Sequence, residues 1–266
     1  MTGPSSVGHA NARARRGSPE RATLRRLSPA PLTILYQDPM LVAIDKPSGM
    51  AVHRSSQVRD RAPALQRLRD QLGQRVYPVH RLDRGTSGVL LFALDSAAAA
   101  AVAEVLRRRE IDKRYLAVVR GFAPPSAEID HALTEEPGRE PQAATTSLRR
   151  LGTVELPIAV GRYPVARYSL VQLRPHTGRL HQLRKHMAHL RHPIVGDVRH
   201  GEGRHNRLFR QHLQVHRLLL HAHSLTLPHP EDGRPLRLRA PPDEQLRGLL
   251  ERLGWAQALE PAVQGP

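Results

Sequence analysis

His80-Arg81-Leu82-Asp83-Arg84-Gly85-Thr86-Ser87-Gly88 runs directly into Val89–Leu94, a continuous apolar segment. A short apolar run of this kind predicts a buried strand. Charges, hydroxyls and glycines therefore gather where the chain enters the core. Charged side chains at such a place lower the stability of the fold unless they form ion pairs. Charges kept there without such partners indicate a functional role. Taken alone, Asp83 is more typical of a turn cap or an ion-pair partner than of a catalytic group.

Two later segments combine charge with expected burial in the same way. Lys113–Arg120 alternates like a half-buried strand, and Tyr115 within it is typical of ordinary strand tyrosines. Leu180–Leu190 has apolar residues at helical spacing, with Arg184 beside that stripe. A guanidinium so near a core needs a carboxylate partner, unless it belongs to the exposed face of the helix.

The remaining patterns indicate the fold class. The expected elements are hairpins of Thr33–Gln37 with Leu41–Asp45 and of Leu218–Leu227 with Pro235–Arg239, strands over 144–155 and 167–174, and helices over 62–72, Ser96–Arg109 and Asp243–Leu253. Ser96 is the expected cap of its helix. Because strands and helices do not alternate regularly, the order favours an α+β fold with a mixed or mostly antiparallel sheet.

The charge of the chain points to an anionic partner. The 266 residues include 41 Lys and Arg against 24 Asp and Glu, a net charge of +17. Such an excess favours nucleic acid, with a generally Arg-rich composition as the alternative. Residues 1–28 are basic and unpatterned, which predicts a disordered extension, or alternatively an organellar transit peptide. A folded domain over 29–256 and a tail over 257–266 are expected to follow.

The composition argues against several other classes of protein. The chain has no cysteine, so disulfides, thiolate metal sites and cysteine nucleophiles are excluded. The apolar stretches are too short to span a bilayer, and no apolar segment follows the basic start, so we expect a cytoplasmic protein without a membrane partner. Histidine spacings such as that of His212 and His216 lack the further ligands of a zinc site, so no metal is expected.

The three segments together resemble the RluA family of pseudouridine synthases. The signature of that family is His-Arg-Leu-Asp, two variable residues and Thr-Ser-Gly, which is complete at 80–88. Its Lys-x-Tyr strand and its Gly-Arg-x-His-Gln-Leu-Arg helix match 113–115 and 178–184, and His192–Asp197 is similar to its next block. The resemblance covers nearly the whole folded domain. It implies the pseudouridine synthase fold, a long mixed sheet with flanking helices around a central RNA-binding cleft.

The resemblance also implies a reaction and the residues that perform it. Uridine becomes pseudouridine when its glycosidic C–N bond breaks and the base rejoins the ribose through C5. The family pattern assigns the catalytic carboxylate to Asp83, its pairing partner to Arg184, and base stacking with a candidate base role to Tyr115. Arg81 would fill the place of the flipped base. Further substrate-binding residues are expected at His80, Thr86, Arg179, His181 and Gln182. No cofactor is implied.

Within the family, the blocks at 161–164, 188–193 and 200–207 resemble the TruC branch, whose members modify tRNA. We therefore expect an RNA substrate, namely tRNA, with ribosomal RNA as the alternative and with no obligate protein partner. Arg204–Arg210 is expected to be a basic loop that contacts this RNA. Two other classes stay open, a non-catalytic RNA-binding protein on the same fold and a metal-dependent nuclease or hydrolase.

Overall fold

The buried strand expected after the Asp83 segment is present. Every residue of β4 (Ser87–Ala93) is buried, because its alternate side chains pack into core clusters on opposite faces of the sheet. The computed structural model describes residues 1, 3, 30–53, 63–135 and 138–259. All described helices and strands belong to the unit Pro31–Pro266. Most of the predicted extension over 1–28 and of the predicted tail over 257–266 lies outside the described residues.

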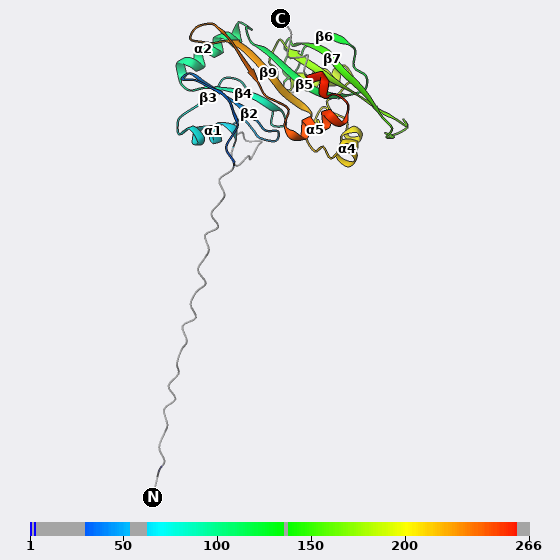
Figure 1. Cartoon of the computed structure of the whole chain (residues 1–266), viewed down its shortest axis with the longest axis horizontal. Helices are drawn as coiled ribbons and strands as arrows, with labels where there is room; N and C mark the ends of the chain where they lie inside the picture. The colour runs from blue at the N-terminus through cyan, green and yellow to red at the C-terminus, as the bar shows by residue number, and fades with distance from the viewer. Residues whose placement is uncertain (2, 4–29, 54–62, 136–137, 260–266) are drawn as a thin grey trace. The chain divides into compact units, whose positions relative to one another are not determined.

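Ten strands form one sheet (Figure 1). Its order is β1 (Ile34–Gln37), β2 (Leu41–Lys46), β4, β9 (Leu220–Pro228), β5 (Asp112–Arg120), β8 (Ala166–Pro175), β7 (Thr145–Leu156) and β6 (Ser126–Asp130). In addition, β3 (Tyr77–Pro78) pairs with β4, and β10 (Pro235–Arg239) pairs with β9. The β4–β9 pair is parallel, and the other pairs of described strands are antiparallel. This confirms the predicted α+β class and the mixed, mostly antiparallel sheet.

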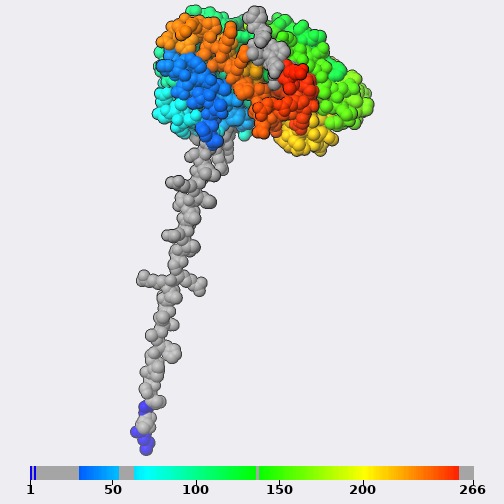
Figure 2. Space-filling view, viewed as in Figure 1, coloured from blue at the N-terminus to red at the C-terminus, as the bar shows by residue number. Residues whose placement is uncertain are grey.

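Helices pack on the sheet through their apolar faces. The helices α1 (Ala64–Leu72) and α3 (Gln182–His189) contribute Leu68, Leu183 and Met187 to one core cluster, and α2 (Ser96–Arg107) packs into the cluster on the opposite face of β4. The helices α4 (Gly203–His212) and α5 (Glu244–Arg252) share a third cluster, and lie side by side in Figure 2 (yellow and orange-red). A 3-10 turn, η1 (Ala256–Leu259), follows α5. Among the described helices, none has the length and apolarity that a membrane span requires.

The prediction that Ser96 caps α2 was wrong. The N-cap is Asp95, which has an extended backbone and accepts a hydrogen bond from the amide of Ala98 at 2.8 Å. Ser96 is instead the first helical residue. A carboxylate at the N-cap both satisfies a free amide and interacts favourably with the positive end of the helix dipole.

The prediction of a basic loop over Arg204–Arg210 was also wrong, because this segment lies in α4. The helix buries Leu208 and Phe209 in the core, together with the amide side chain of Asn206. With so few apolar residues in the segment, helical periodicity is hardly visible in the sequence. The surrounding arginines lie on the outer face of a helix rather than on a loop.

Candidate active site

Asp83 lies in the loop that leads from β3 into β4, and side chains of the preceding segment hold that loop. Lys46 is fully buried at the end of β2, and its Nζ donates to the carbonyl of Arg84 at 3.3 Å. Ser48 Oγ donates to the carbonyl of Gly85 at 2.7 Å. A buried ammonium group must satisfy its donors, so Lys46 fixes the backbone next to Asp83.

Ser87 and Gly88, at the end of the motif, have structural roles. Ser87 is buried, and its Oγ lies 2.8 Å from Nδ1 of His221. Gly88 has a φ of +108°, and a Cβ at this position would come within 2.2 Å of the carbonyl oxygen of Ala222 on β9. Only glycine permits such a close approach of two backbones. These residues fix where β4 begins and therefore where Asp83 stands.

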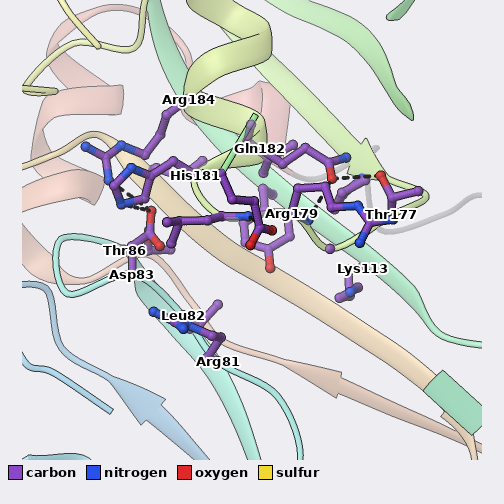
Figure 3. A pocket seen from close by; sticks show the side chains of 17 residues that line it. Arg81, Leu82, Asp83, Thr86, Lys113, Thr177, Arg179, His181, Gln182 and Arg184 are labelled. Carbon is purple, nitrogen blue, oxygen red and sulfur yellow. Dashed lines mark hydrogen bonds and ion pairs between the residues drawn. The ribbon is translucent and has the colours of Figure 1, made fainter. Parts of the chain in front are cut away.

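A series of ion pairs anchors the carboxylate of Asp83. Arg184, on α3, donates from Nη1 to Oδ2 of Asp83 at 3.0 Å (Figure 3). Its Nε and Nη2 donate to the two carboxylate oxygens of Asp197 at 2.7 and 2.8 Å. Asp197 is buried, and the amides of Arg199 and His200 also donate to it, each at 2.9 Å. The carboxylate partner that the sequence required for Arg184 is thus present, together with a second one.

These ion pairs keep Arg184 and Asp197 charged. Burial alone would raise the pKa of Asp197, but hydrogen bonds from Arg184 and from the amides of His200 and Arg199 lower it to about 2. Burial acts to lower the pKa of Arg184, whereas its hydrogen bonds to Asp197 and Asp83 raise that pKa above its usual value. Arg184 therefore presents a permanent positive charge to Asp83 at neutral pH.

Two neutral side chains also lie close to Asp83. Tyr115, on β5, is buried, and this burial together with the charge of Asp83 raises the pKa of the phenol well above its usual range. His181 has its Nε2 3.9 Å from Oδ2 of Asp83 and its Nδ1 3.0 Å from Nε2 of His200. Burial lowers the pKa of His181 to about 4, although the charge of Asp83 acts in the opposite direction. At neutral pH the phenol is therefore protonated and the imidazole uncharged.

A cavity of about 470 Å³ opens beside Asp83 and Tyr115 (Figure 3). It is lined by five of the six predicted substrate-binding residues, Arg81, Thr86, Arg179, His181 and Gln182. In Figure 3, Arg81 lies on the opposite side of Asp83 from Arg184. His80 is not part of the lining. Its Nε2 accepts a hydrogen bond from the amide of Leu91 at 3.1 Å, and burial lowers its pKa to about 3, so it supports β4.

Gln182 lines the cavity, but its amide is engaged within the protein. Its Nε2 donates to the carbonyl of Thr145 at 2.9 Å. Its Oε1 accepts from Oγ1 of Thr177 at 2.7 Å and from the amide of Arg179 at 3.0 Å. Gln182 therefore fixes the loop that forms one rim of the cavity.

Sequence reasoning gave no role to three residues that the structure places at or next to the site. Lys113 and Glu135 line the cavity, and Asp197 holds Arg184 from behind. In the sequence, Asp197 follows Gly196 in an expected turn, and an aspartate at such a place usually accepts hydrogen bonds from nearby backbone amides. The partner of its carboxylate lies 13 residues earlier in the chain, on a helix. Sequence alone therefore does not distinguish this aspartate from an ordinary turn residue.

Two other histidines, His186 and His221, bond to groups of the protein. His186 bonds through its ring nitrogens to Oγ1 of Thr146 and to the carbonyl of His131, at 2.9 and 3.0 Å. His221 bonds to Ser87 and to the carbonyl of Ala240. Within residues 30–53, 63–135 and 138–259, no cluster of three or more His, Asp or Glu side chains is arranged to hold a metal ion.

The chain matches a known protein family. A family model described as RNA pseudouridylate synthase matches residues 40–189, which include Asp83, Tyr115 and Arg184. The chain belongs to this family, which confirms the resemblance seen in the motifs, and it is an RNA pseudouridine synthase.

Individual relatives match over most of their length. A protein of Vibrio cholerae, tRNA pseudouridine synthase C, is 49% identical over 239 residues, which are 86% of this chain and 98% of the relative. The tRNA pseudouridine synthase C of Salmonella typhi is 48% identical, covering 84% of this chain and 90% of the relative. Among solved structures, the human RNA Pseudouridylate Synthase Domain Containing 4 protein superposes with a TM-score of 0.66 at 27% identity, covering 84% of this chain and 93% of its own.

Proposed function

We propose that this chain isomerises a specific uridine of tRNA to pseudouridine without a cofactor, and that Asp83 is its catalytic nucleophile. The observation that carries the assignment is the carboxylate of Asp83 at the edge of a cavity, held by a guanidinium that a second carboxylate orients from behind. A carboxylate so placed can act on the oxocarbenium-like centre that forms when a glycosidic bond breaks.

Arg184 positions Asp83 for this step. The Nη1 group holds one carboxylate oxygen of Asp83, at 3.0 Å. The carboxylate is the nucleophilic form of the side chain, and a charge-assisted hydrogen bond from the guanidinium fixes its orientation. Because Asp197 occupies the other edge of the guanidinium, Arg184 cannot rotate away without breaking two further bonds.

Tyr115 stacks on the uracil ring and is the candidate base for the C5 proton. Burial and then the charge of Asp83 raise the pKa of its phenol well above its usual range, so the phenol carries its own proton at neutral pH. Tyr115 can therefore accept the C5 proton only after its phenolic proton has passed to the substrate or to water.

The target base has to leave the RNA helix to reach Asp83, and the stacking and base pairing that it loses cost a few kcal/mol. Arg81 is exposed at the cavity and fits the vacated position, because a planar guanidinium can stack on bases and pair with phosphate. The cavity of about 470 Å³ then receives the flipped nucleotide. Thr86, Arg179 and His181 lie in its wall and are the proposed contacts to the base and ribose.

tRNA is favoured over ribosomal RNA because the relatives of Vibrio cholerae and Salmonella typhi are both named tRNA pseudouridine synthases and match nearly the whole folded domain. Recognition of a compact stem depends on backbone and shape, which suits a basic cleft. Cytoplasmic localisation stays a prediction from the sequence.

The test compares wild-type protein with Asp83→Asn on separate pools of tRNA transcripts and ribosomal RNA fragments, followed by mapping of pseudouridine. We expect one modified position in tRNA with the wild type, and none with the variant at similar tRNA affinity, because the substitution is nearly isosteric. Asp70→Asn, at an exposed carboxylate on α1, is the matched control and should remain active. Modification of ribosomal RNA alone would contradict the substrate. Turnover by Asp83→Asn would contradict the catalytic assignment and favour another nucleophile.

A further inference from the structure

A second, basic cavity continues from the active-site cavity. Its volume is about 440 Å³, and the two cavities share Lys113, Pro175, Thr177, Gly178 and Arg179 as lining residues. This basic groove is lined by the side chains of Arg107, Arg109, Lys113, Arg174, His176 and Arg179. None of the described residues that line it is Asp or Glu. The groove therefore forms a positively charged path from the catalytic cavity to the C-terminal end of α2.

Arg109 differs from Arg107 and Arg174 because its guanidinium forms no ion pair with a described residue. Arg107 forms an ion pair with Glu104, and Arg174 forms one with Asp112 at 2.6 Å. Arg109 is exposed, and its guanidinium has no hydrogen-bond or ion-pair partner among the residues that the structure describes. It is therefore available to an external anion.

The backbone of Arg109 has a conformation that favours glycine. Its φ is +59°, and the amides of Arg109 and Glu110 close the end of α2 with two hydrogen bonds of 3.1 Å. The helices α1 and α5 end with glycines in this conformation, Gly73 and Gly254. A side chain at such a φ makes the fold less stable than glycine would.

The simplest alternative role for Arg109 is stabilisation of the helix end. Cations near a helix C-terminus interact favourably with the helix dipole. In α2, however, Arg107 and Arg108 already occupy the last turn and the C-cap. Relief of the strained φ raises stability under either explanation, whereas only loss of a phosphate contact weakens tRNA binding, so tRNA affinity separates the two when Arg109 is replaced by glycine.

We propose that the basic groove binds phosphates of the RNA strand next to the nucleotide in the active-site cavity, and that Arg109 is one of its phosphate-binding side chains. This proposal rests on the proposed function, because the nucleotide in the cavity is the target uridine. A guanidinium offers two parallel N–H donors to phosphate oxygens. Contacts of this type fix affinity and position without reading the base. They place the strand so that one nucleotide can enter the cavity beside Asp83.

The experiment compares Arg109→Gly with Arg191→Gly in the full-length protein. Arg191 follows α3, is exposed, has a φ of +61°, and lines neither cavity, so the control removes the same charge and the same strain. The dissociation constant of a fluorescent tRNA transcript is measured over a range of salt concentrations, together with kcat, KM and Tm. For Arg109→Gly we expect binding about tenfold weaker, the loss of one charge-assisted contact. The plot of log affinity against log salt should become less steep, its slope falling in magnitude by about 0.7 to 1. KM should rise, whereas kcat at saturating RNA should not change. Tm should be unchanged or raised.

Three results would overturn the proposal. Unchanged tRNA affinity in Arg109→Gly, whatever its Tm, would assign Arg109 to the helix end. An equal loss of affinity in Arg191→Gly would show that binding follows net charge and not the basic groove. An unchanged salt slope in Arg109→Gly would mean that no phosphate contact was removed. By contrast, the expected pattern of affinities with no pseudouridine formed by the wild type would support the groove and refute the proposed function.

Discussion

Replacing Asp197 by asparagine should destabilise the fold far more than the same change at Asp83, although both carboxylates bind Arg184. Oδ1 of Asp197 accepts from Nη2 of Arg184 and from two backbone amides, and Oδ2 accepts from Nε of Arg184. In Asp197→Asn an amide NH₂ faces Nε of Arg184, donor against donor. The variant also leaves the guanidinium with Asp83 as its one remaining carboxylate.

The magnitude follows from the bonds that change. Asp197→Asn removes one charge-assisted hydrogen bond, worth about 1.5–3 kcal/mol, and makes the two bonds from the amides of Arg199 and His200 neutral, which roughly halves their strength. The side chain of Asp197 is 1% exposed, so water cannot replace the lost partner. Breaking a buried pair in this way costs about 3–5 kcal/mol. The side chain of Asp83 is 19% exposed and has one bond to Arg184, so Asp83→Asn should cost about 1 kcal/mol.

The assay is urea unfolding followed by tryptophan fluorescence. The chain has a single tryptophan, Trp255, which is 4% exposed in the core cluster of α4 and α5 and reports on loss of that core. For a domain of this size the difference corresponds to a Tm shift on the order of 10 °C for Asp197→Asn. A free energy of unfolding within about 1 kcal/mol of the wild type, or above that of Asp83→Asn, would refute the reasoning.

Three further predictions concern pH, metal ions and the N-terminal segment. The pKa of Asp197 is lowered from 3.8 to about 2 in the folded protein, so its contribution to stability is complete above about pH 4 and is lost as the pH falls through 2. Acid titration of the unfolding free energy should therefore give a shallower decline for Asp197→Asn than for the wild type, and parallel curves would contradict this. Pseudouridine formation should continue in excess EDTA, provided that monovalent salt keeps the RNA folded, since the proposed nucleophile is Asp83 and Arg184 supplies a positive charge beside it. A strict divalent-ion requirement of the chemical step would count against this role of Asp83. Deleting residues 1–28, whose sequence has no core-forming pattern, should leave Tm and kcat within error of the full chain, and a large drop in either would show that the segment belongs to the folded domain.

Local signals in the sequence were sufficient for much of the fold. The apolar run at Val89–Leu94, the hairpin of Leu218–Leu227 with Pro235–Arg239 and the apolar stripe of Leu180–Leu190 each depend on neighbours that are close in sequence, and each element is present. Helix ends were less accurate, as in α3, which begins at Gln182. The first residues of a helix are set by capping bonds rather than by periodicity.

Parts of the site that depend on distant contacts were not predictable in the same way. Asp83 and Arg184 are separated by 101 positions. Their pairing was predicted from the resemblance of the motifs to a family, and no local sequence pattern indicates it. Asn206 illustrates the problem. In the sequence it is one polar residue in a basic segment, whereas in α4 it is buried, accepts from the amide of Gly196 and donates to the carbonyl of Asp197. Its role is visible only when the helix and the turn are placed together.

The register of the sheet explains why the motif that contains the proposed catalytic residue Asp83 also contains a glycine. Gly88 of β4 lies opposite Ala222 of β9, and Ala222 lies opposite Tyr115 of β5, so the three residues form a row across adjacent strands. A side chain at position 88 would collide with the carbonyl of Ala222 and push β4 away from β9. Asp83 precedes Gly88 by five positions on the same chain segment. How closely β4 can approach β9 therefore contributes to the position of Asp83 relative to Tyr115, although Gly88 itself does not line the cavity.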